Sequence, residues 1–479
     1  MFLQLNNISL IYIIYAIISI TIIIIEKRQP EKTIAWLLIF LAFPPLGLFF
    51  YVFLGRNWKL NKLNDSYSNE LKELVYNALY ETKTVEYRPL IELLAKNSES
   101  PLFIDNNVDI FYNGEDKFKA LKRELLKAKH HIHMEYYIVN NDRIGNEIKD
   151  ILIQKASEGV YVRFIIDKVG SIKLNKNYIN ELKQAGIDVV SYSYFLAPLL
   201  RYINTQINYR NHRKIVVIDG LVGFIGGINI GDEYLGRKKY GFWRDTHLMI
   251  KGDFVLGLQS VFLDDYLTIK SANKEVLFYD RDFRPYFPKT TYENSKGQVL
   301  QLVKSGPDSN YPSILQGVLK MINLAKDHVY ITTPYFVPPN SIMEALKIAA
   351  LGGIDVKILF PEQSDHLTVH LASETYFQEI IKCGVEIYYY DKKAFVHSKV
   401  ITVDGKIGTV GTANMDIRSY YQNYEINAVL YDKNLVSSLE AEFKKDLENS
   451  RLITSAYFDE LPFYKKIAQD LARVFSYLL

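Results

Sequence analysis

The chain has 479 residues, of which 48% are hydrophobic and 23% are charged, and its formal net charge is +3. This length is sufficient for two or three domains with a large core. So small a net charge argues against a nucleic-acid-binding protein, whose binding domain is usually strongly basic. Cys383 is the only cysteine, which excludes an intrachain disulfide and a metal cluster held by thiolates.

The first 55 residues contain two long uncharged segments, residues 8–25 and 34–54. Each is close to the length of about 20 apolar residues that a helix needs to cross a bilayer. A signal peptide is not favoured, because no basic residue precedes the first segment and no small-residue cleavage site follows it. We expect two transmembrane helices within residues 1–55. Pro44 and Pro45 interrupt the second segment, so a re-entrant or interfacial placement stays open for it.

Charge does not orient these segments, because three basic residues follow each of them. Two spans would nevertheless leave the N-terminus and the rest of the chain on the same side of the membrane. Residues 56–100 are polar and charged, and we expect them to form a linker or a small cap.

From about residue 102 the sequence alternates between strand-like and helix-like segments, which predicts an α/β architecture. Segments of the first part recur in order in the second part, and such self-similarity indicates duplication of one domain. We place the first domain at residues 101–290 and the second at 291–479, with turn-forming prolines near the boundary. The recurring pairs are 128–139 with 325–337, 159–165 with 353–359, and 185–189 with 383–387.

One motif recurs in register, 185 residues apart and without a gap. Residues 212–229 read HRKIVVIDGLVGFIGGIN and residues 397–414 read HSKVITVDGKIGTVGTAN. In both copies the Lys is two residues after the His, the Asp is seven after the His, and the Asn is ten after the Asp. Two such copies predict one site built from two related halves.

An Asp-Gly pair between two β-rich runs is a strong hairpin signal. A two-residue turn would place Ile218 opposite Leu221, His212 opposite Gly227 and His397 opposite Thr412, and would fold each Asn back beside its His. Side chains two apart on a strand share a face, so each His would lie beside its Lys. We expect the glycines at positions 226 and 411 to leave room for a ligand to approach the backbone.

This set of side chains suits a phosphodiester. A lysine provides a point charge for phosphate oxygens, and an asparagine adds a donor. One neutral histidine can attack phosphorus while a second protonates the leaving oxygen, and their ordinary pKa makes both roles available near neutral pH. The residues we expect in these roles are His212, Lys214, Asn229, His397, Lys399 and Asn414.

Four carboxylates have two interpretations each. Asp219 and Asp404 have either a chemical role or a backbone role in the turn, where Asp is favoured. Asp245 and Glu425 either orient a catalytic histidine by accepting its second N–H or form ordinary loop salt bridges.

We expect no metal site, because a lysine beside each histidine would repel a divalent cation. His130, His131 and His133 alternate at a strand entry, where packing is favoured over zinc binding.

Residues 462–479 place apolar side chains at helical spacing. This pattern is typical of a helix packed on the domain, and a contact with a membrane surface stays open as the alternative. The side chains are Ile467, Leu471, Val474, Phe475 and Leu478.

The paired motifs resemble the phospholipase D superfamily, and the whole chain resembles its bacterial cardiolipin synthases. The resemblance to the synthases is carried by residues 226–235 (GGINIGDEYL), by residues 243–247 (WRDTH), by the apolar segment around residues 35–38 (AWLL) and by the final five residues, FSYLL. The fold that this implies is α/β, with two duplicated phospholipase D-like domains that form one pseudo-symmetric catalytic body after two transmembrane helices.

The resemblance implies a transesterification without a cofactor, in which two phosphatidylglycerol molecules give cardiolipin and glycerol. It makes His212 the nucleophile and His397 the acid and base, although the symmetry of the motifs leaves the exchange of these roles open. It also carries Asp219 and Asp404 over as active-site residues.

The partners implied are phosphatidylglycerol and the cell membrane, with the catalytic body on the cytoplasmic side and no nucleic acid. A phospholipase D-type lipid hydrolase is the main alternative, because the same motifs serve it. A nucleic-acid phosphodiesterase and a non-catalytic membrane scaffold are less favoured. The acyl-chain preference and the oligomeric state are not indicated.

Overall fold

A computed structural model describes residues 87–192, 209–272, 282–288 and 297–476 and, nearer the N-terminus, residues 14–15, 17–18, 20–21, 25, 30–43, 46–47 and 50–51. The chain divides into two compact units, residues 1–60 with 193–209 and residues 61–192 with 210–479. We call the second one the catalytic unit.

The N-terminal unit contains helix α2, Pro30–Ala42. The rings of Trp36 and Phe40 lie 5.1 and 5.3 Å from that of Tyr51, and Phe40 and Tyr51 are buried. None of the helices among the described residues combines the length and the apolar character that a membrane crossing requires. Most of the segment 8–25 lies outside the described residues, so the expectation of two spans stays a prediction.

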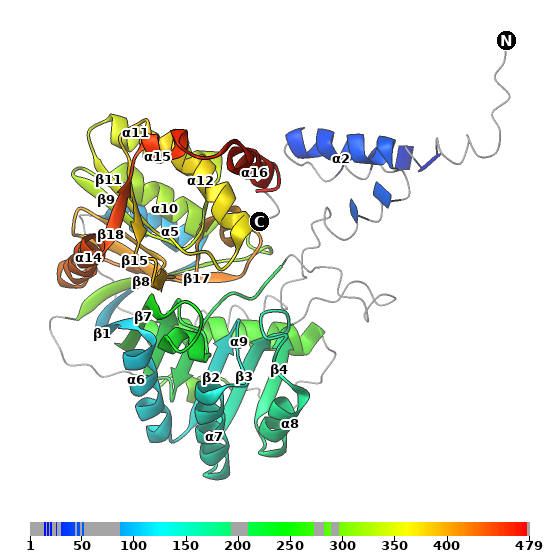
Figure 1. Cartoon of the computed structure of the whole chain (residues 1–479). Coiled ribbons are helices and arrows are strands. Elements are labelled where there is room, and N and C mark those ends of the chain that lie inside the picture. Colours follow the sequence, from blue (N-terminus) through cyan, green and yellow to red (C-terminus); the bar gives the residue numbers. More distant parts are fainter. Residues whose placement is uncertain are drawn as a thin grey trace. The chain divides into compact units, whose positions relative to one another are not determined.

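The catalytic unit is organised around one sheet, to which the described residues contribute sixteen strands (Figure 1). The first half contributes the order β4-β3-β2-β5-β6-β7-β1, and the second half continues it as β8-β17-β15-β14-β9-β11-β12-β18. The two orders mirror each other about the antiparallel pair β1–β8, in which Phe103 lies opposite Leu300. The duplicated α/β architecture predicted from the sequence is therefore confirmed. The first-half strands are β1 Leu102–Asn113, β2 His131–Tyr136, β3 Tyr161–Asp167, β4 Asp188–Tyr192, β5 Ile215–Ile218, β6 Val222–Gly226 and β7 Phe242–Gly252.

The second half adds one strand at the outer edge, β18, and one short strand, β13, that pairs with β7 of the first half. Its strands are β8 Gln298–Ser305, β9 His328–Thr332, β11 Asp355–Pro361, β12 Glu386–Tyr390, β13 Ala394–Val396, β14 Val400–Val403, β15 Ile407–Gly411, β17 Glu425–Leu430 and β18 Ser450–Ile453, with a separate pair of β10 Phe336–Val337 and β16 Met415–Asp416. Residues 289–296 are outside the described residues, so the domain boundary at 290 stays a prediction.

Helices connect the parallel strands of each half, and several begin at a polar cap. The side chains of Asn113, Asp142 and Asp432 accept a backbone N–H from the first turn of α6, α7 and α14. The helices of the catalytic unit are α5 Arg88–Asn97, α6 Gly114–Lys127, α7 Arg143–Ser157, α8 Lys176–Gln184, α9 Phe254–Ala272, α10 Ser313–Leu324, α11 Asn340–Leu351, α12 Leu367–Ile381, α13 Ile417–Tyr421, α14 Lys433–Glu448, α15 Ser455–Asp459 and α16 Phe463–Val474.

Both halves share a core, because one apolar cluster contains Phe103 and Leu248 from the first half and Leu302 and Ile426 from the second. Part of the predicted linker also belongs to this body, since Leu90 and Leu94 of α5 are buried in the core of the second half. The strands that carry the two motifs therefore lie on one continuous scaffold.

The two motif hairpins differ from the predicted register by one residue. Ile218 lies opposite Val222 and Val403 opposite Ile407, so each loop has three residues instead of two. Asp219 has a φ of 55°, in the left-handed region that suits Asp and Gly, and Leu221 is the extra residue. The expected pairing of His212 with Gly227 is therefore wrong, as is that of His397 with Thr412.

Candidate active site

Each motif histidine leaves its own hairpin and joins a strand of the other half. The backbone N–H of His212 donates to the carbonyl of Tyr424, beside β17, at 3.0 Å. The N–H of His397 donates to the carbonyl of Arg244, in β7, at 2.7 Å. Because β7 and β17 occupy equivalent places in the two halves, this exchange brings both motifs to the junction of the halves.

Each histidine also contacts a carboxylate of the opposite half. Nδ1 of His212 lies 3.0 Å from both oxygens of Glu425, and Nδ1 of His397 lies 2.7 Å from Oδ2 of Asp245. Both carboxylates are fully buried. A carboxylate at Nδ1 favours the tautomer with the proton there, which leaves Nε2 with a lone pair. Of the two interpretations of Asp245 and Glu425, the geometry therefore favours orientation of the histidines.

The two lysines lie beside their histidines. Nζ of Lys214 donates to the carbonyl of His212 at 2.6 Å, and Nζ of Lys399 donates to the carbonyl of His397. Both lysines are buried, and Lys399 acts electrostatically on His212 as well as on its own neighbour. One lysine from each half therefore lies beside the pair of histidines.

Burial determines the protonation of this cluster. It lowers the pKa of His212 to about 4, against the opposing charge of Glu425, and it also lowers the pKa of His397. It lowers the pKa of Lys214 to about 7 and that of Lys399 to about 8. Burial raises the pKa of Glu425, but the charge and hydrogen bond of His212 outweigh this and leave that pKa below its ordinary value. At neutral pH His212 is therefore uncharged in the resting protein, and Glu425 is ionised.

The two asparagines differ. The side chain of Asn229 is occupied, because Oδ1 accepts the N–H of Ile138 at 3.1 Å and Nδ2 donates to the hydroxyl of Tyr234 at 2.7 Å. The side chain of Asn414 is buried, and none of the described residues forms a hydrogen bond with its Oδ1. Asn414 therefore has an unused acceptor, whereas both side-chain groups of Asn229 are occupied.

The glycines of the motifs make room for neighbouring strands. We had expected them to make room for a ligand. A Cβ on Gly226 would lie 2.5 Å from the carbonyl of Thr246, and one on Gly411 would lie 2.2 Å from Oδ1 of Asn427. A Cβ on Gly227 would lie 2.1 Å from Oδ1 of Asp245. The absence of a side chain at Gly227 therefore makes room for the carboxylate that contacts His397.

The motif aspartates lie at the far end of the hairpins from the histidines. Asp219 accepts the backbone N–H groups of residues 129, 130 and 131 at 2.8–2.9 Å, and Asp404 accepts those of residues 326, 327 and 328 at 2.8 Å. Seven residues of extended chain, roughly 20 Å, separate Asp219 from His212. The expectation of a chemical role for Asp219 and Asp404 is therefore not met, and both connect a turn to the start of the adjacent strand.

The sequence analysis missed several residues around the histidines. The ring of Tyr137 lies 4.9 Å from His212, and that of Trp243 lies 5.4 Å from His397. The carboxylate of Asp167, at the end of β3, accepts the N–H of Asn211 at 3.0 Å and so holds the residue before His212. An acidic residue directly after an apolar strand was the available signal for Asp167.

Among the described residues, no three His, Cys, Asp or Glu side chains are grouped as a metal site would require. His131 and His133 are buried, and both are hydrogen-bonded to the side chain of Gln259, at 2.9 and 2.8 Å. The ring of His133 stacks on Phe262. These contacts account for His131 and His133 as core residues.

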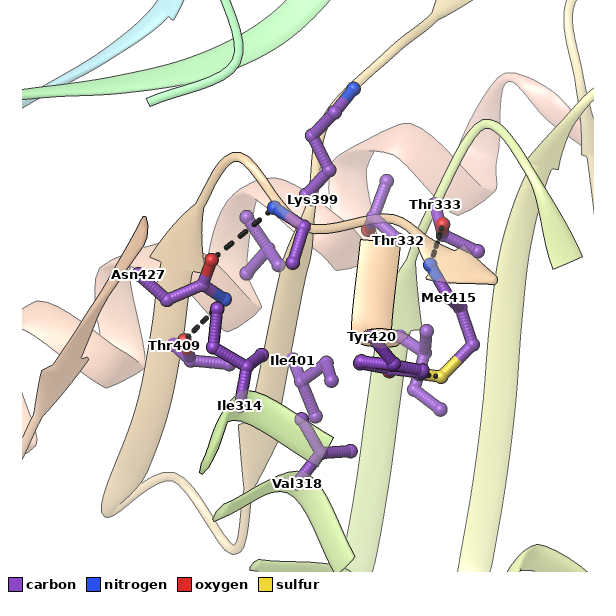
Figure 2. Close-up of a pocket in the computed structure, with 13 residues that line it drawn as sticks. Ile314, Val318, Thr332, Thr333, Lys399, Ile401, Thr409, Met415, Tyr420 and Asn427 are labelled. Carbon is purple, nitrogen blue, oxygen red and sulfur yellow. Dashed lines mark hydrogen bonds between the residues drawn. The ribbon is translucent and has the colours of Figure 1, made fainter. Parts of the chain in front are cut away.

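A small pocket lies under the second motif hairpin and has Lys399 of this cluster among its lining residues. Its lining includes Ile314, Val318, Ile401 and Met415, so it is largely apolar. Figure 2 shows that the side chain of Lys399 points away from this pocket. The pocket therefore belongs to the core under the site.

Comparison with known proteins supports the resemblance seen in the sequence. Residues 121–240 and 318–447 match the family described as "Cardiolipin synthase, PLD-like domain", and residues 11–56 match "Phospholipase_D-nuclease N-terminal". The cardiolipin synthase of Geobacillus kaustophilus is 42% identical over 478 residues, which cover 97% of this chain and 92% of that protein. The chain belongs to the cardiolipin synthase family.

Cardiolipin synthase 2 of Bacillus cereus is also 42% identical, over 96% of this chain and 89% of that protein. Family membership makes the chain a phosphatidyltransferase of phospholipid biosynthesis. The crystal structure of phosphatidylserine synthase from Haemophilus influenzae has a TM-score of 0.62 at 15% identity and covers 82% of this chain and all of that one, so it shares the fold.

Proposed function

We propose that the chain joins two phosphatidylglycerol molecules into cardiolipin and glycerol by way of a phosphatidyl-histidine, with His212 and His397 as the catalytic pair. The observation that carries this proposal is the crossed arrangement in which each histidine binds a carboxylate of the other half. Such an arrangement supports the action of both histidines on one phosphorus atom, one as nucleophile and one as acid and base, which a two-step displacement requires.

In the first step Nε2 of His212 attacks the phosphorus of one phosphatidylglycerol. The bond from phosphorus to the glycerol oxygen breaks. His397, which takes up a second proton at Nε2 when the phosphate anion binds and is balanced at Nδ1 by Asp245, gives that proton to the oxygen. The phosphorus-bound ring of His212 is cationic, and Glu425 stabilises it with both oxygens. Asp245 contacts His397 with Oδ2 alone and accepts the N–H of Thr246 with Oδ1. Both oxygens of Glu425 lie at His212, although one also accepts from Asn423 at 3.2 Å, and this two-oxygen contact supports His212 as the nucleophile.

In the second step a head-group hydroxyl of another phosphatidylglycerol attacks the same phosphorus. His397 accepts the hydroxyl proton, and the phosphorus–nitrogen bond to His212 breaks. Lys214, Lys399 and the amide NH2 of Asn414 hold the phosphate oxygens, and Asn229 orients the loop after β2 through its bond to Ile138. The side chains of His212 and His397 are only 11% and 8% exposed, which limits attack by water on the intermediate.

We also propose that residues 1–55 contain two membrane spans and that the catalytic unit, with domains at 101–290 and 291–479, faces the cytoplasm. The two uncharged segments support this, because they bring the site to the bilayer that contains its substrate.

Product analysis tests the proposal. Purified protein incubated with phosphatidylglycerol as the only lipid should release glycerol and cardiolipin in equal amounts. Phosphatidic acid without cardiolipin would instead identify a lipid hydrolase. His212→Ala and His397→Ala should each abolish the product while the folded protein remains.

A further inference from the structure

Helix α16 exposes an apolar stripe to solvent. Phe463 is 78% exposed and Val474 is 75% exposed, although both are hydrophobic. At 100° per residue, the six exposed apolar side chains span an arc of about 120° on one side of the helix. The stripe consists of Phe463, Tyr464, Ile467, Leu471, Val474 and Phe475.

The opposite side of α16 is fixed on α12. Gln469 is buried and donates to Glu374 at 2.8 Å, and the hydroxyls of Ser476 and Tyr376 are 3.2 Å apart. The guanidinium of Arg473 lies 4.3 Å over the ring of Tyr376. Rotating the stripe inward would leave these buried polar groups without partners, so its outward orientation is built into the fold.

We propose that this stripe inserts into the interfacial layer of a phospholipid bilayer and docks the catalytic unit on the membrane that holds its substrate. The proposal rests on the proposed function, in which both substrates are bilayer lipids. An amphipathic helix with aromatic and aliphatic side chains on its outer face is typical of an interfacial helix. Of its charged residues, Arg473 pairs with Glu379 of α12, and the remaining Lys465, Lys466 and Asp470 sum to +1, which complements anionic phosphatidylglycerol.

Helix α12 links the stripe to the site. Asp365 acts electrostatically on His397 and Lys399, and α12 begins two residues later at Leu367, which is 66% exposed. From Leu367 to Glu374, where α16 packs, the helix rises roughly 10 Å. One bilayer surface can therefore contact the stripe and the start of α12 together.

Depth-dependent quenching tests the proposal on the full chain in phosphatidylglycerol-containing liposomes. A Cys383→Ser background receives a fluorophore at Leu471→Cys or, as a matched control, at Ile348→Cys on α11. Ile348 is 67% exposed and Leu471 is 57% exposed, so both labels sit on exposed apolar helix positions. We expect nitroxides on the upper acyl chain to quench the label at 471 and not at 348, and aqueous iodide to do the reverse.

Equal iodide access at both positions would overturn the proposal. So would protection of position 471 from both quenchers, which would indicate a protein partner such as a second copy of the chain.

A rate measurement adds an independent arm. Ile467→Ser with Leu471→Ser should lower cardiolipin formation in liposomes several-fold and leave it unchanged with short-chain phosphatidylglycerol dispersed in detergent. The control pair Ile348→Ser with Leu351→Ser should change neither rate. Equal rates for the two pairs in liposomes would contradict the proposal. Absence of cardiolipin from the wild-type protein would refute the proposed function and leave the quenching result interpretable.

Discussion

Glu425→Gln isolates the charge that the opposite half contributes to His212. The substitution keeps the shape of the side chain and an oxygen for Nδ1–H, and it removes one negative charge at 3.0 Å. In the resting enzyme His212 is neutral, so the charge matters little for substrate binding. It matters when the ring becomes cationic on bonding to phosphorus, and the loss is therefore expected in kcat.

Coulomb's law gives the magnitude. Two unit charges 3.0 Å apart interact with about 5 kcal/mol at an effective dielectric constant of 20. A fully developed charge would correspond to about 10⁴-fold in rate, and a half-developed one to about 10²-fold. We therefore expect kcat to fall by a factor between these two values.

The assay is the initial rate of cardiolipin formation, measured with thermal unfolding on the same preparations. Glu440→Gln is a matched control, because Glu440 contacts Nε2 of His328 at 2.8 Å beside the Asp404 turn, outside the histidine pair. This control should change stability and leave kcat within a few-fold of wild type. A folded Glu425→Gln enzyme that retains a tenth or more of the wild-type kcat would refute the reasoning.

Three further predictions concern the Asp219 turn, the close contact between Gly227 and Asp245, and the pH profile. Asp219→Asn should reduce the free energy of unfolding by about 2 kcal/mol, because a charged acceptor of three N–H groups is lost, and should leave the activity per folded molecule unchanged. Gly227→Ala should displace Asp245 from His397 and lower kcat without abolishing folding. The value of kcat/KM should persist down to about pH 4, because His212 stays neutral above that pH. It should fall between about pH 7 and 8, where Lys214 and Lys399 lose their charges.

Each has a contrary outcome. A catalytic defect in Asp219→Asn with unchanged stability would restore a chemical role to that residue. Wild-type kcat in Gly227→Ala would show that the Asp245 contact is dispensable. An acid limb near the ordinary histidine pKa of 6.5 would contradict the effect of burial on His212, and Lys214→Arg should move the alkaline limb upward.

The duplicated fold was predictable from the sequence because the motif recurs in register with its flanking strands and helices. The crossing of the histidines was not, because His212 pairs with Tyr424 and contacts Glu425, 213 residues away in the chain. Local strand geometry predicted that His212 pairs with Gly227 in its own hairpin. In the folded protein its backbone pairs with Tyr424 of the other half instead.

The roles of the motif aspartates and glycines were also beyond local patterns. Asp in a turn satisfies both a backbone and a chemical interpretation, and only the three N–H groups around Asp219 distinguish them. The helical period of residues 463–475 was evident, but the period does not say which face is covered. That required the contacts of Gln469 and Ser476 with α12.

The central claim is a covalent phosphatidyl group on one histidine of the crossed pair. Rapid quenching of the full-chain enzyme with phosphatidylglycerol under alkaline denaturing conditions, which preserve phosphohistidine, followed by peptide mass spectrometry, tests it most directly. We predict the added phosphatidyl mass on the peptide that contains His212, and its absence in His212→Ala. A working enzyme that carries no adduct on either histidine would contradict the account.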